Sequence, residues 1–310
     1  MKKVMNKYIS IVAVVVLSCM SGMSLRAQTM PSLLLDQDPV SIAVGSARVA
    51  SDGDAFALQN NVASMSFAEE TMSVKAGFTL WQPSYANMKN IGLGGIYRIS
   101  DRLGLGLDFK YLMKQPYSGV TGNGSAIRDS EFRPSEINFA AGVSYAFLDC
   151  LSAGVALRYA GSSLSPDAKA NIFGADLGLF FSMNSVRAGL SVNNLGTKVK
   201  YSEKAYPQPM LLKAGAGYDL TMGTSVLSFD AEADILFAGG VMAGVGCEYS
   251  FRDMVFARAG YHYGNSANVV PSHGAAGLGL KIVGINLDVA YIFGSKVLAN
   301  SMCVSLGYSF

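Results

Sequence analysis

Charged residues are scarce in this sequence. Only 15% of its 310 residues are Asp, Glu, Lys or Arg, whereas soluble domains carry about 25%. The formal net charge of +2 is too small and too dispersed for a nucleic-acid-binding protein. Half of the residues are hydrophobic and the mean hydropathy is +0.30, which excludes a disordered chain. An ordinary soluble enzyme would also need more charge on its surface.

Long apolar runs and histidines are scarce as well. After residue 28 no stretch of 18 consecutive apolar residues occurs, so a helical membrane protein is excluded. His262 and His273 are the only histidines, and the sequence contains no Gly-x-Ser-x-Gly turn that could carry a serine nucleophile. We interpret both histidines as solvated polar side chains, and we expect no enzymatic activity and no cofactor.

Cysteine is rare and its spacing has no pattern. The chain has four cysteines, and none of them forms a Cys-x-x-Cys pair that could bind a metal. Cys19 lies in the N-terminal targeting region discussed next. We expect Cys150, Cys247 and Cys303 to be unpaired buried thiols, and we predict no metal site at them.

The first 27 residues have the features of a secretory signal peptide. Basic residues at positions 2–7 precede an apolar centre at residues 9–17, and the segment ends at Ala27. Cleavage there removes four basic and no acidic residues, so the mature chain has 20 basic and 22 acidic residues. An alternative is a lipoprotein signal with an acylated Cys19. Both interpretations describe an exported protein.

The rest of the chain alternates apolar side chains with polar or small ones. The clearest case is residues 103–113, where every second residue is apolar from Leu103 to Met113. Such alternation over about ten residues is typical of a half-exposed β-strand. We count about fourteen such segments, near residues 71–80, 88–98, 103–113, 135–147, 151–160, 172–182, 185–193, 209–219, 224–234, 241–249, 254–263, 274–281, 284–293 and 300–310.

The connections between these segments alternate between short and long. Short turns lie near Asp101, Asp149, Asn184, Met222, Arg252 and Val283, and the long connection 114–134 is the largest of the others. This plan predicts an all-β membrane fold, a closed antiparallel outer-membrane β-barrel of about 14 strands. An even strand number places both termini on the short-turn side, which is the periplasm. The predicted location is the bacterial cell outer membrane, with lipid around the barrel.

Fourteen charged residues fall on one face of the predicted strands. If Leu103, Phe139 and Val255 face lipid, the strand charges have the opposite parity, as expected from the cost of a charge in the bilayer. The apolar stripe on one face of each strand is also compatible with a soluble β-sandwich. The export signal, the loop asymmetry and the alternating, aromatic segment Met302–Phe310 favour a barrel. The inward set is Lys75, Asp108, Lys110, Glu136, Arg158, Asp176, Arg187, Lys213, Asp230, Glu232, Glu248, Arg258, Lys281 and Asp288.

Aromatic residues gather near the ends of the predicted strands. Such clusters are typical of the girdles at the two membrane interfaces of a barrel. We assign to these girdles Trp81, Tyr85, Tyr97, Phe147, Phe181, Tyr218, Tyr249 and Tyr308.

Many inward positions are glycines, and two interpretations are open. Glycine permits the bending of a barrel wall, or it makes room for something packed inside. The candidate for the second interpretation is residues 28–70, which do not alternate and include a helix-like run from Asp54 to Asn60. We therefore expect a signal peptide (1–27), a hatch inside the lumen (28–70) and a transmembrane barrel (71–310).

Residues 43–65 carry a resemblance to a known family. They are rich in small residues and end in Asn61-Val62-Ala63-Ser64-Met65. This resembles the N-terminal hatch of FadL-like barrels, in particular the PorV/PorQ family of the type IX secretion system. In that family a small-residue helix precedes Asn-Pro-Ala and an aliphatic residue, so Asn61, Ala63 and Met65 match and Val62 replaces the proline. Residues 132–139 and 155–159 look most like the PorV branch.

Two functions from different classes follow from this resemblance. PorV-like members are implied to receive cargo proteins at a translocon and pass them to an attachment complex, and PorQ-like members to help hold the surface ligase machinery. The alternative is a FadL-like channel that takes up a lipophilic small molecule. An orphan structural barrel is the third interpretation. We favour type IX protein secretion.

Two groups of residues are candidates for specific roles. We expect ion pairs on the lumen wall, because Lys213 should lie across from Asp230 or Glu232, and Glu248 and Arg258 should be diagonal neighbours. The stripe Asp230, Glu232 and Asp234 could instead bind a cation. The long connection 114–134 is the expected contact surface for a partner, with Tyr117, Arg128 and Phe132 as its candidate residues.

Overall fold

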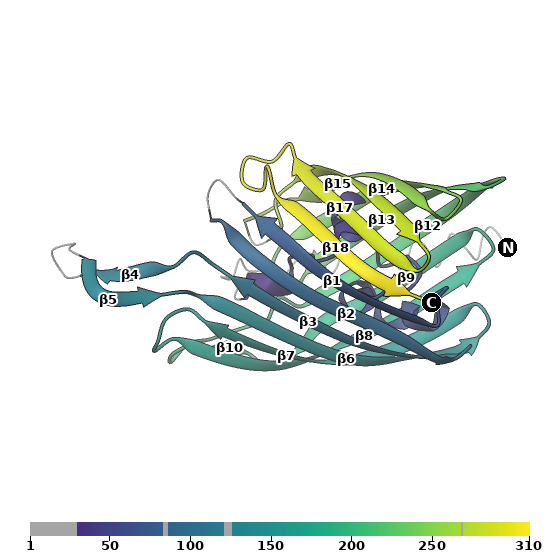
Figure 1. Ribbon diagram of the computed structural model, residues 1–310. Coiled ribbons are helices and arrows are strands. Elements are labelled where there is room, and N and C mark those ends of the chain that lie inside the picture. Colours follow the sequence, from purple (N-terminus) through teal and green to yellow (C-terminus); the bar gives the residue numbers. More distant parts are fainter. Residues whose placement is uncertain (1–29, 83–85, 121–125, 268) are drawn as a thin grey trace.

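The computed structural model describes residues 30–82, 86–120, 126–267 and 269–310. The expected signal peptide, its cleavage site and Cys19 lie outside these residues. Within the described chain, 14 strands form a closed barrel in which neighbours are antiparallel (Figure 1). They are β1 (Met72–Trp81), β2 (Met88–Ser100), β3 (Leu103–Met113), β6 (Ser135–Leu148), β7 (Leu151–Ser163), β8 (Lys169–Met183), β9 (Val186–Gly196), β12 (Leu211–Met222), β13 (Ser225–Leu236), β14 (Val241–Phe251), β15 (Val255–Gly264), β16 (His273–Ile282), β17 (Ile285–Phe293) and β18 (Met302–Ser309).

The first and last strands close the barrel. β1 pairs with β18 from Ser73 opposite Ser309 to Leu80 opposite Met302. Met72 and Phe310 extend this pairing, since each donates its backbone N–H to the other's carbonyl at 2.9 Å. Closure leaves no exposed sheet edge, and the backbone groups of the wall are paired along the whole ring.

The two ends of the barrel differ in their connections. Connections of two or three residues, such as 223–224, define the short-turn end, where the chain also terminates. The longer connections define the long-loop end. There β4 (Tyr117–Val120) pairs with β5 (Ala126–Phe132) in a projecting hairpin (Figure 1). Residues 197–210 contain the paired strands β10 (Val199–Lys200) and β11 (Ala205–Tyr206). The sequence predicted these loops but not their strands.

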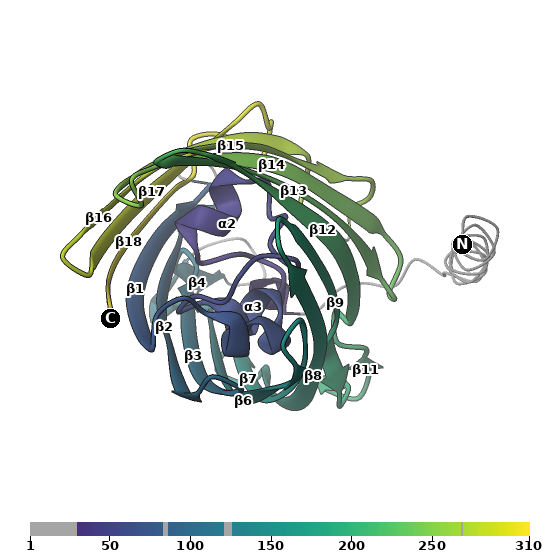
Figure 2. The same ribbon diagram turned by 90° about the vertical axis from the view of Figure 1, so that its right-hand side faces the viewer.

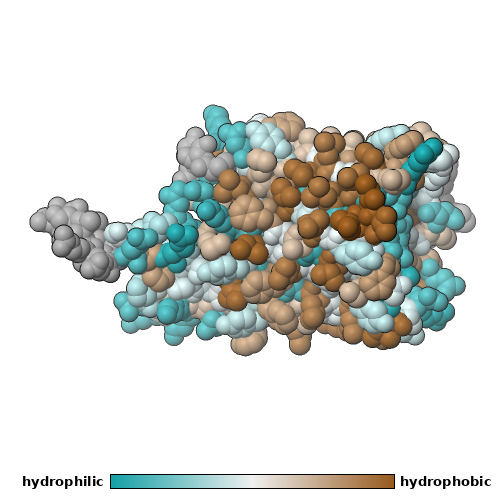
Figure 3. Space-filling model, in the orientation of Figure 1, coloured by the Kyte–Doolittle hydropathy of each residue, from teal (hydrophilic) through white to brown (hydrophobic). Residues whose placement is uncertain are grey.

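The outer face of the barrel is apolar and the inner face carries the charges. Leu157 and Leu278 are 69% and 67% exposed on the outside, whereas Asp108 and Asp176 are buried inside. On the face shown in Figure 3, hydrophobic residues gather over the middle of the barrel between more polar ends. Of the aromatic residues expected at the interfaces, Tyr85 lies outside the described residues. Trp81 is a correction: it is buried in the lumen, because it has the inward parity of β1.

Four short helices of the described chain lie inside the barrel. They are the 3-10 helices η1 (Pro31–Leu33) and η2 (Val62–Phe67) and the α-helices α2 (Pro39–Ala43) and α3 (Ala57–Asn60), and the view along the barrel shows α2 and α3 within the ring of strands (Figure 2). Among the described residues, no helix has the length and apolar character that a membrane crossing requires. The three described cysteines are unpaired, and only Cys303 is buried.

Candidate functional site

The N-terminal part of the chain, residues 30–70, fills the barrel, and we call it the lumen segment. Its first α-helix has clear local signals. The Asp38 carboxylate accepts hydrogen bonds from the N–H groups of Val40 and Ser41 at 3.1 and 3.2 Å, which caps α2. Pro39 occupies the first helical position, where its missing N–H has no cost. A helix of five residues is nevertheless marginal alone, so its contacts with the wall must hold it.

Glycines of the wall allow the lumen segment to approach the strands closely. A β-carbon at Gly189 would lie 1.9 Å from the carbonyl oxygen of Val49, and one at Gly154 would lie 2.8 Å from the amide nitrogen of Ala63. No larger residue fits at such distances. The inward glycines therefore make room for the lumen segment. The same close approach occurs at Gly94, Gly106, Gly178, Gly244, Gly246 and Gly260.

The residues of the expected hatch motif lie where the lumen segment meets β7 and β8. Asn61 Nδ2 donates to the carbonyl oxygens of Val49 and Leu179, each at 2.9 Å. Its Oδ1 accepts from the N–H of Ala63 at 3.1 Å and so caps η2. Met65 is fully buried and packs against Gly106. Asn61 thus joins two turns of the lumen segment to the wall.

Lys213 forms an ion pair in the lumen, but the strand register differs from the expected one. Lys213 lies directly opposite Asp234, and its Nζ binds the diagonal neighbour Glu232 at 2.9 Å. The expected register was wrong because the turn lies at residues 223–224 rather than at Met222. Glu232 also accepts the N–H of Val49 at 2.6 Å. The pair therefore fastens the lumen segment as well as the wall.

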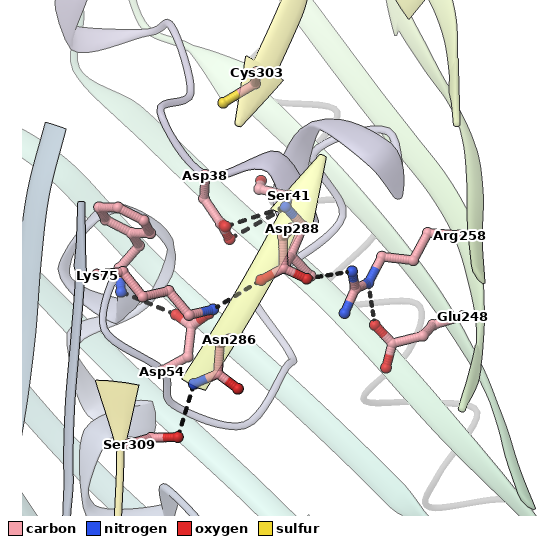
Figure 4. Close-up of polar contacts among 12 residues, drawn as sticks. Asp38, Ser41, Asp54, Lys75, Glu248, Arg258, Asn286, Asp288, Cys303 and Ser309 are labelled. Atoms are coloured by element: carbon pink, nitrogen blue, oxygen red, sulfur yellow. Dashed lines mark hydrogen bonds and ion pairs between the residues drawn. The ribbon is translucent and has the colours of Figure 1, made fainter. Parts of the chain in front are cut away.

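Glu248 and Arg258 begin a longer chain of charges. They are direct partners across β14 and β15, not diagonal ones as expected, and they form an ion pair. Arg258 Nη1 also binds Asp288 at 2.7 Å, and Asp288 lies 3.6 Å from Lys75 Nζ. Lys75 reaches Asp54 of the lumen segment at 3.2 Å (Figure 4). The charges on β1, β14, β15 and β17 thus converge on one carboxylate of the lumen segment.

The pKa values of two carboxyl groups of the lumen segment shift in opposite directions. Burial by itself raises the pKa of Asp54, but Lys75 and Arg48 outweigh burial and hold the pKa at about 2. Burial, followed by repulsion from Asp54, raises the pKa of Asp38 to about 6. Folding therefore stabilises the ionised form of Asp54 and penalises that of Asp38.

The three acidic residues that could have formed a cation site have different partners. Asp230 contacts Arg187 Nη2 at 3.4 Å, and the same guanidinium binds Asp219 at 2.8 Å. Glu232 binds Lys213 as described above, and Asp234 is the residue directly opposite Lys213. Arg187 and Lys213 therefore offset part of the negative charge along this stretch of the wall.

The two histidines are buried, which corrects the expectation that they are solvated. His262 and His273 are 3% and 2% exposed. They are direct partners across β15 and β16, and their rings stack with centroids 5.0 Å apart. His262 Nδ1 lies 3.3 Å from the carbonyl oxygen of Gly45. The sequence pattern shows that His262 faces inward. It does not show that the lumen segment packs over the histidine and buries it.

The long-loop half of the lumen is packed with leucines of the lumen segment. Leu33 packs against a cluster around Ile172 and Val199, Leu34 against a cluster around Leu236, and Leu35 against a cluster around Trp81. A cavity that these leucines line together with the wall has a volume of about 50 Å³. A much larger cavity, of about 780 Å³, lies at the short-turn end.

Several wall charges bind the backbone of the lumen segment, which sequence analysis missed. Lys110 Nζ donates to the carbonyl oxygens of Ser32 and Leu35 at 3.1 and 2.5 Å. On the neighbouring strands it faces Gly92 and Asn138, so no carboxylate is opposite it. The sequence did contain a signal for this contact. Lys110 has inward parity but no opposite charge on the adjacent strands, which indicates that its partner lies outside the wall.

The candidate partner-contact residues lie on the projecting hairpin. Tyr117 on β4 and Phe132 on β5 pack edge to face, with ring centroids 6.0 Å apart. The Tyr117 hydroxyl donates to the carbonyl oxygen of Leu164 at 2.7 Å, which ties the hairpin to the loop between β7 and β8. Arg128 lies on β5 between them in the chain.

Comparisons with known proteins give one family and one fold. A family model described as "Type IX secretion system protein PorV" matches residues 23–234. No curated protein matches the chain. The barrel is similar to the toluene transporter TbuX of Ralstonia pickettii (14% identity, 88% of this chain and 98% of that one, TM-score 0.63) and the toluene transporter TodX of P. putida (17% identity, 88% and 98%, TM-score 0.62). A FadL homologue of Pseudomonas aeruginosa is more distant (12% identity, 89% and 99%, TM-score 0.50).

Proposed function

The chain belongs to the family of the type IX secretion system protein PorV, and we propose that it receives cargo proteins or holds attachment-complex subunits during type IX secretion, without catalysis. It is a barrel of the bacterial outer membrane. In our proposal the short turns and the chain end at Phe310 face the periplasm, and the long loops face the cell exterior. The sequence pattern predicted both termini on the periplasmic side, but Met30, at the start of the described chain, packs in the long-loop half of the lumen among Ala160, Ile172 and Val199.

The observation that carries this proposal is the packing of the long-loop half of the lumen. Pockets for small ligands typically measure about 300–1,000 Å³, whereas the cavity lined by Leu33, Leu34 and Leu35 measures about 50 Å³. The leucines at 33–35 occupy the three apolar clusters there, and Lys110 holds the backbone around them. A barrel packed in this way suits a scaffold for protein partners better than a conduit for lipophiles.

The projecting hairpin of β4 and β5 is the proposed contact surface. It extends beyond the barrel at the long-loop end (Figure 1). Tyr117 is 44% exposed and is held by its ring contact with Phe132 and its bond to the β7–β8 loop. An exposed aromatic residue on a fixed support is the kind of residue that dominates protein interfaces.

Uptake of a hydrophobic small molecule is the alternative. The apolar clusters that now hold Leu33, Leu34 and Leu35 would become a lipophile site if residues 30–35 moved out of them. This alternative therefore requires a displacement of the lumen segment, whereas the secretion proposal does not.

Co-purification from detergent-solubilised outer membrane tests the proposal. Recovery of a large translocon subunit or of cargo with a C-terminal targeting domain supports secretion. A lone monomer that carries a bound fatty acid or aromatic compound supports uptake and contradicts the secretion proposal.

A pair of matched variants makes this test specific. Tyr117→Ala should reduce partner recovery, because it removes the exposed ring of the hairpin. Tyr145→Ala is the control, since Tyr145 is 51% exposed on the outer face of β6, toward the short-turn end. Equal loss in both variants would show that the hairpin is not the contact surface.

A further inference from the structure

The short-turn end of the lumen contains a cavity that no role above uses. Its volume is about 780 Å³, and it lies between the lumen segment and the wall from β8 to β15. A water molecule takes about 30 Å³, so the cavity is far larger than a single ion needs, and it lies within the range of ligand pockets. A smaller cavity of about 190 Å³ shares Arg48, Asp52, Glu69 and Glu248 with it.

The lining is hydrophilic and predominantly acidic. Six carboxylates and three guanidinium groups face the cavity, together with seven hydroxyls, and apolar side chains are few. A lipophile therefore does not fit. The charged residues are Asp52, Glu69, Asp219, Asp230, Glu248 and Asp253 against Arg48, Arg187 and Arg252.

Two of these carboxylates form no direct ion pair. Arg187 binds Asp219 and Asp230, Arg258 binds Glu248, and Lys281 binds Asp253. Asp52 and Glu69 form no ion pair with any described residue. Both belong to the lumen segment, so the carboxylates that are free to bind a cation lie on the segment rather than on the wall.

Buried polar atoms at the cavity also lack hydrogen bonds. Asp230 is a wall residue with only 8% of its side chain exposed, and its Oδ1 has the 3.4 Å contact with Arg187 but no hydrogen bond. Arg48 Nε is a buried donor without an acceptor. Such groups are costly when left unpaired. A fitting ligand must therefore donate to carboxylates and also accept from a guanidinium group.

We propose that this cavity binds a lysine- or arginine-bearing peptide segment that enters from the short-turn end. Its cationic side chain lies beside Asp52 and Glu69, and a backbone carbonyl accepts from Arg48. A metal ion supplies no acceptor for Arg48, and a sugar supplies no positive charge. The assignment of this peptide to a periplasmic protein rests on the proposed orientation of the barrel.

Peptide binding to the purified full-length protein in detergent tests the inference. The probe is a fluorescent seven-residue peptide of glycine, serine and two lysines, and its anisotropy is measured at low salt. We expect saturable binding that weakens as salt rises. The double variant Asp52→Asn with Glu69→Gln should raise Kd about tenfold, because hydrogen bonds to charged groups contribute that much. Asp149→Asn, an exposed carboxylate at the same end but outside the cavity, should leave Kd unchanged.

Several results would overturn the inference. They are absence of saturable binding, equal binding of a matched glutamate peptide, equal binding of spermidine, and equal weakening by the Asp149 variant. If the double variant fails to fold, Glu69→Gln alone serves, because Glu69 is exposed and its replacement leaves the packing intact. The assay uses purified protein, so its failure leaves the secretion proposal standing, and failed co-purification leaves peptide binding standing.

Discussion

Asn61 in the lumen segment and Leu179 in β8 are joined by a hydrogen bond of 2.9 Å from the side-chain amide to the backbone carbonyl. The second amide hydrogen goes to Val49, twelve residues earlier in the lumen segment. One side chain therefore holds two turns of the lumen segment together and fixes both to the barrel wall. The proline of the family motif is not needed for these hydrogen bonds, because Val62 occupies the position of the proline in this chain.

Replacing Asn61 with Ala should lower the free energy of unfolding by about 1–3 kcal/mol, because it leaves buried carbonyl oxygens without a donor. Urea unfolding in detergent micelles measures the change. Ser66→Ala is the control, since the Ser66 hydroxyl bonds only to Ala63 within the lumen segment. A loss in the Ser66 variant as large as that in the Asn61 variant contradicts this role for Asn61.

Lys213→Met should lower barrel stability by about 3–5 kcal/mol, because it leaves Glu232 and Asp234 buried without their cation. Adding Glu232→Gln should recover part of the loss, and unfolding of the single and double variants measures both effects. Secretion should be largely unchanged when barrel abundance is unchanged. Lost secretion at normal abundance would show that Lys213 has a direct role.

Gly189→Ala should displace the lumen segment, because the added methyl group would lie 1.9 Å from the Val49 carbonyl oxygen. Overpacking of this kind costs about 1–3 kcal/mol, and faster amide exchange at residues 47–51 would report the displacement. The matched control is Gly95→Ala on the outer face, where the nearest atom would lie 3.5 Å away. Unchanged exchange in the Gly189 variant contradicts the close fit.

Asp54→Asn should destabilise the protein in a pH-dependent manner. The folded-state pKa of about 2 is below the ordinary value of 3.8, so the carboxylate contributes stability above about pH 4 and loses it as pH falls through 2. The variant should be less stable than the natural chain by on the order of 2 kcal/mol at pH 7, and the difference should shrink at pH 2. An equal difference at both pH values would falsify this assignment.

Deleting residues 29–66 should leave a folded barrel, because the 14 strands of the wall pair with one another and not with the lumen segment. The wall charges would then be solvated by water in the opened lumen. The change in electrophoretic mobility on heating tests whether the barrel is folded. Measurements of solute influx and of partner recovery test its function. Under the secretion proposal partner capture fails, and under the uptake alternative the barrel leaks or stops delivering lipophiles. A variant that changes neither property contradicts the hatch hypothesis.

The fold was predictable because the rule that governs a barrel strand is local. Each outward residue must tolerate lipid, so Leu103–Met113 shows the alternation without reference to any other part of the chain. The strand count and the inward charges followed from the same rule. The assignment of Trp81 to the membrane interface was wrong because an aromatic residue near a strand end can face either lipid or lumen. Trp81 has the same parity along β1 as Lys75, and this parity is inward.

The candidate site was predictable only in part. Parity placed Lys213, Glu232, Glu248 and Arg258 inside. The expected register was wrong at two turns, residues 223–224 and 252–254, so the opposite residues were assigned wrongly. The burial of the two histidines was missed because it depends on Gly45 of the lumen segment, more than 200 positions away in the chain.

The amino-acid sequence by itself determined the barrel and the side of the wall on which its inward charges lie, because the exclusion of charge from lipid acts on every residue separately. Only the tertiary structure decided which partner each inward charge has. Lys110 on β3, Glu232 on β13 and Asp108 on β3 all bind the lumen segment. These partners are far apart in sequence, and they meet because closure of the barrel places the strands around one narrow space that the N-terminal chain must fill.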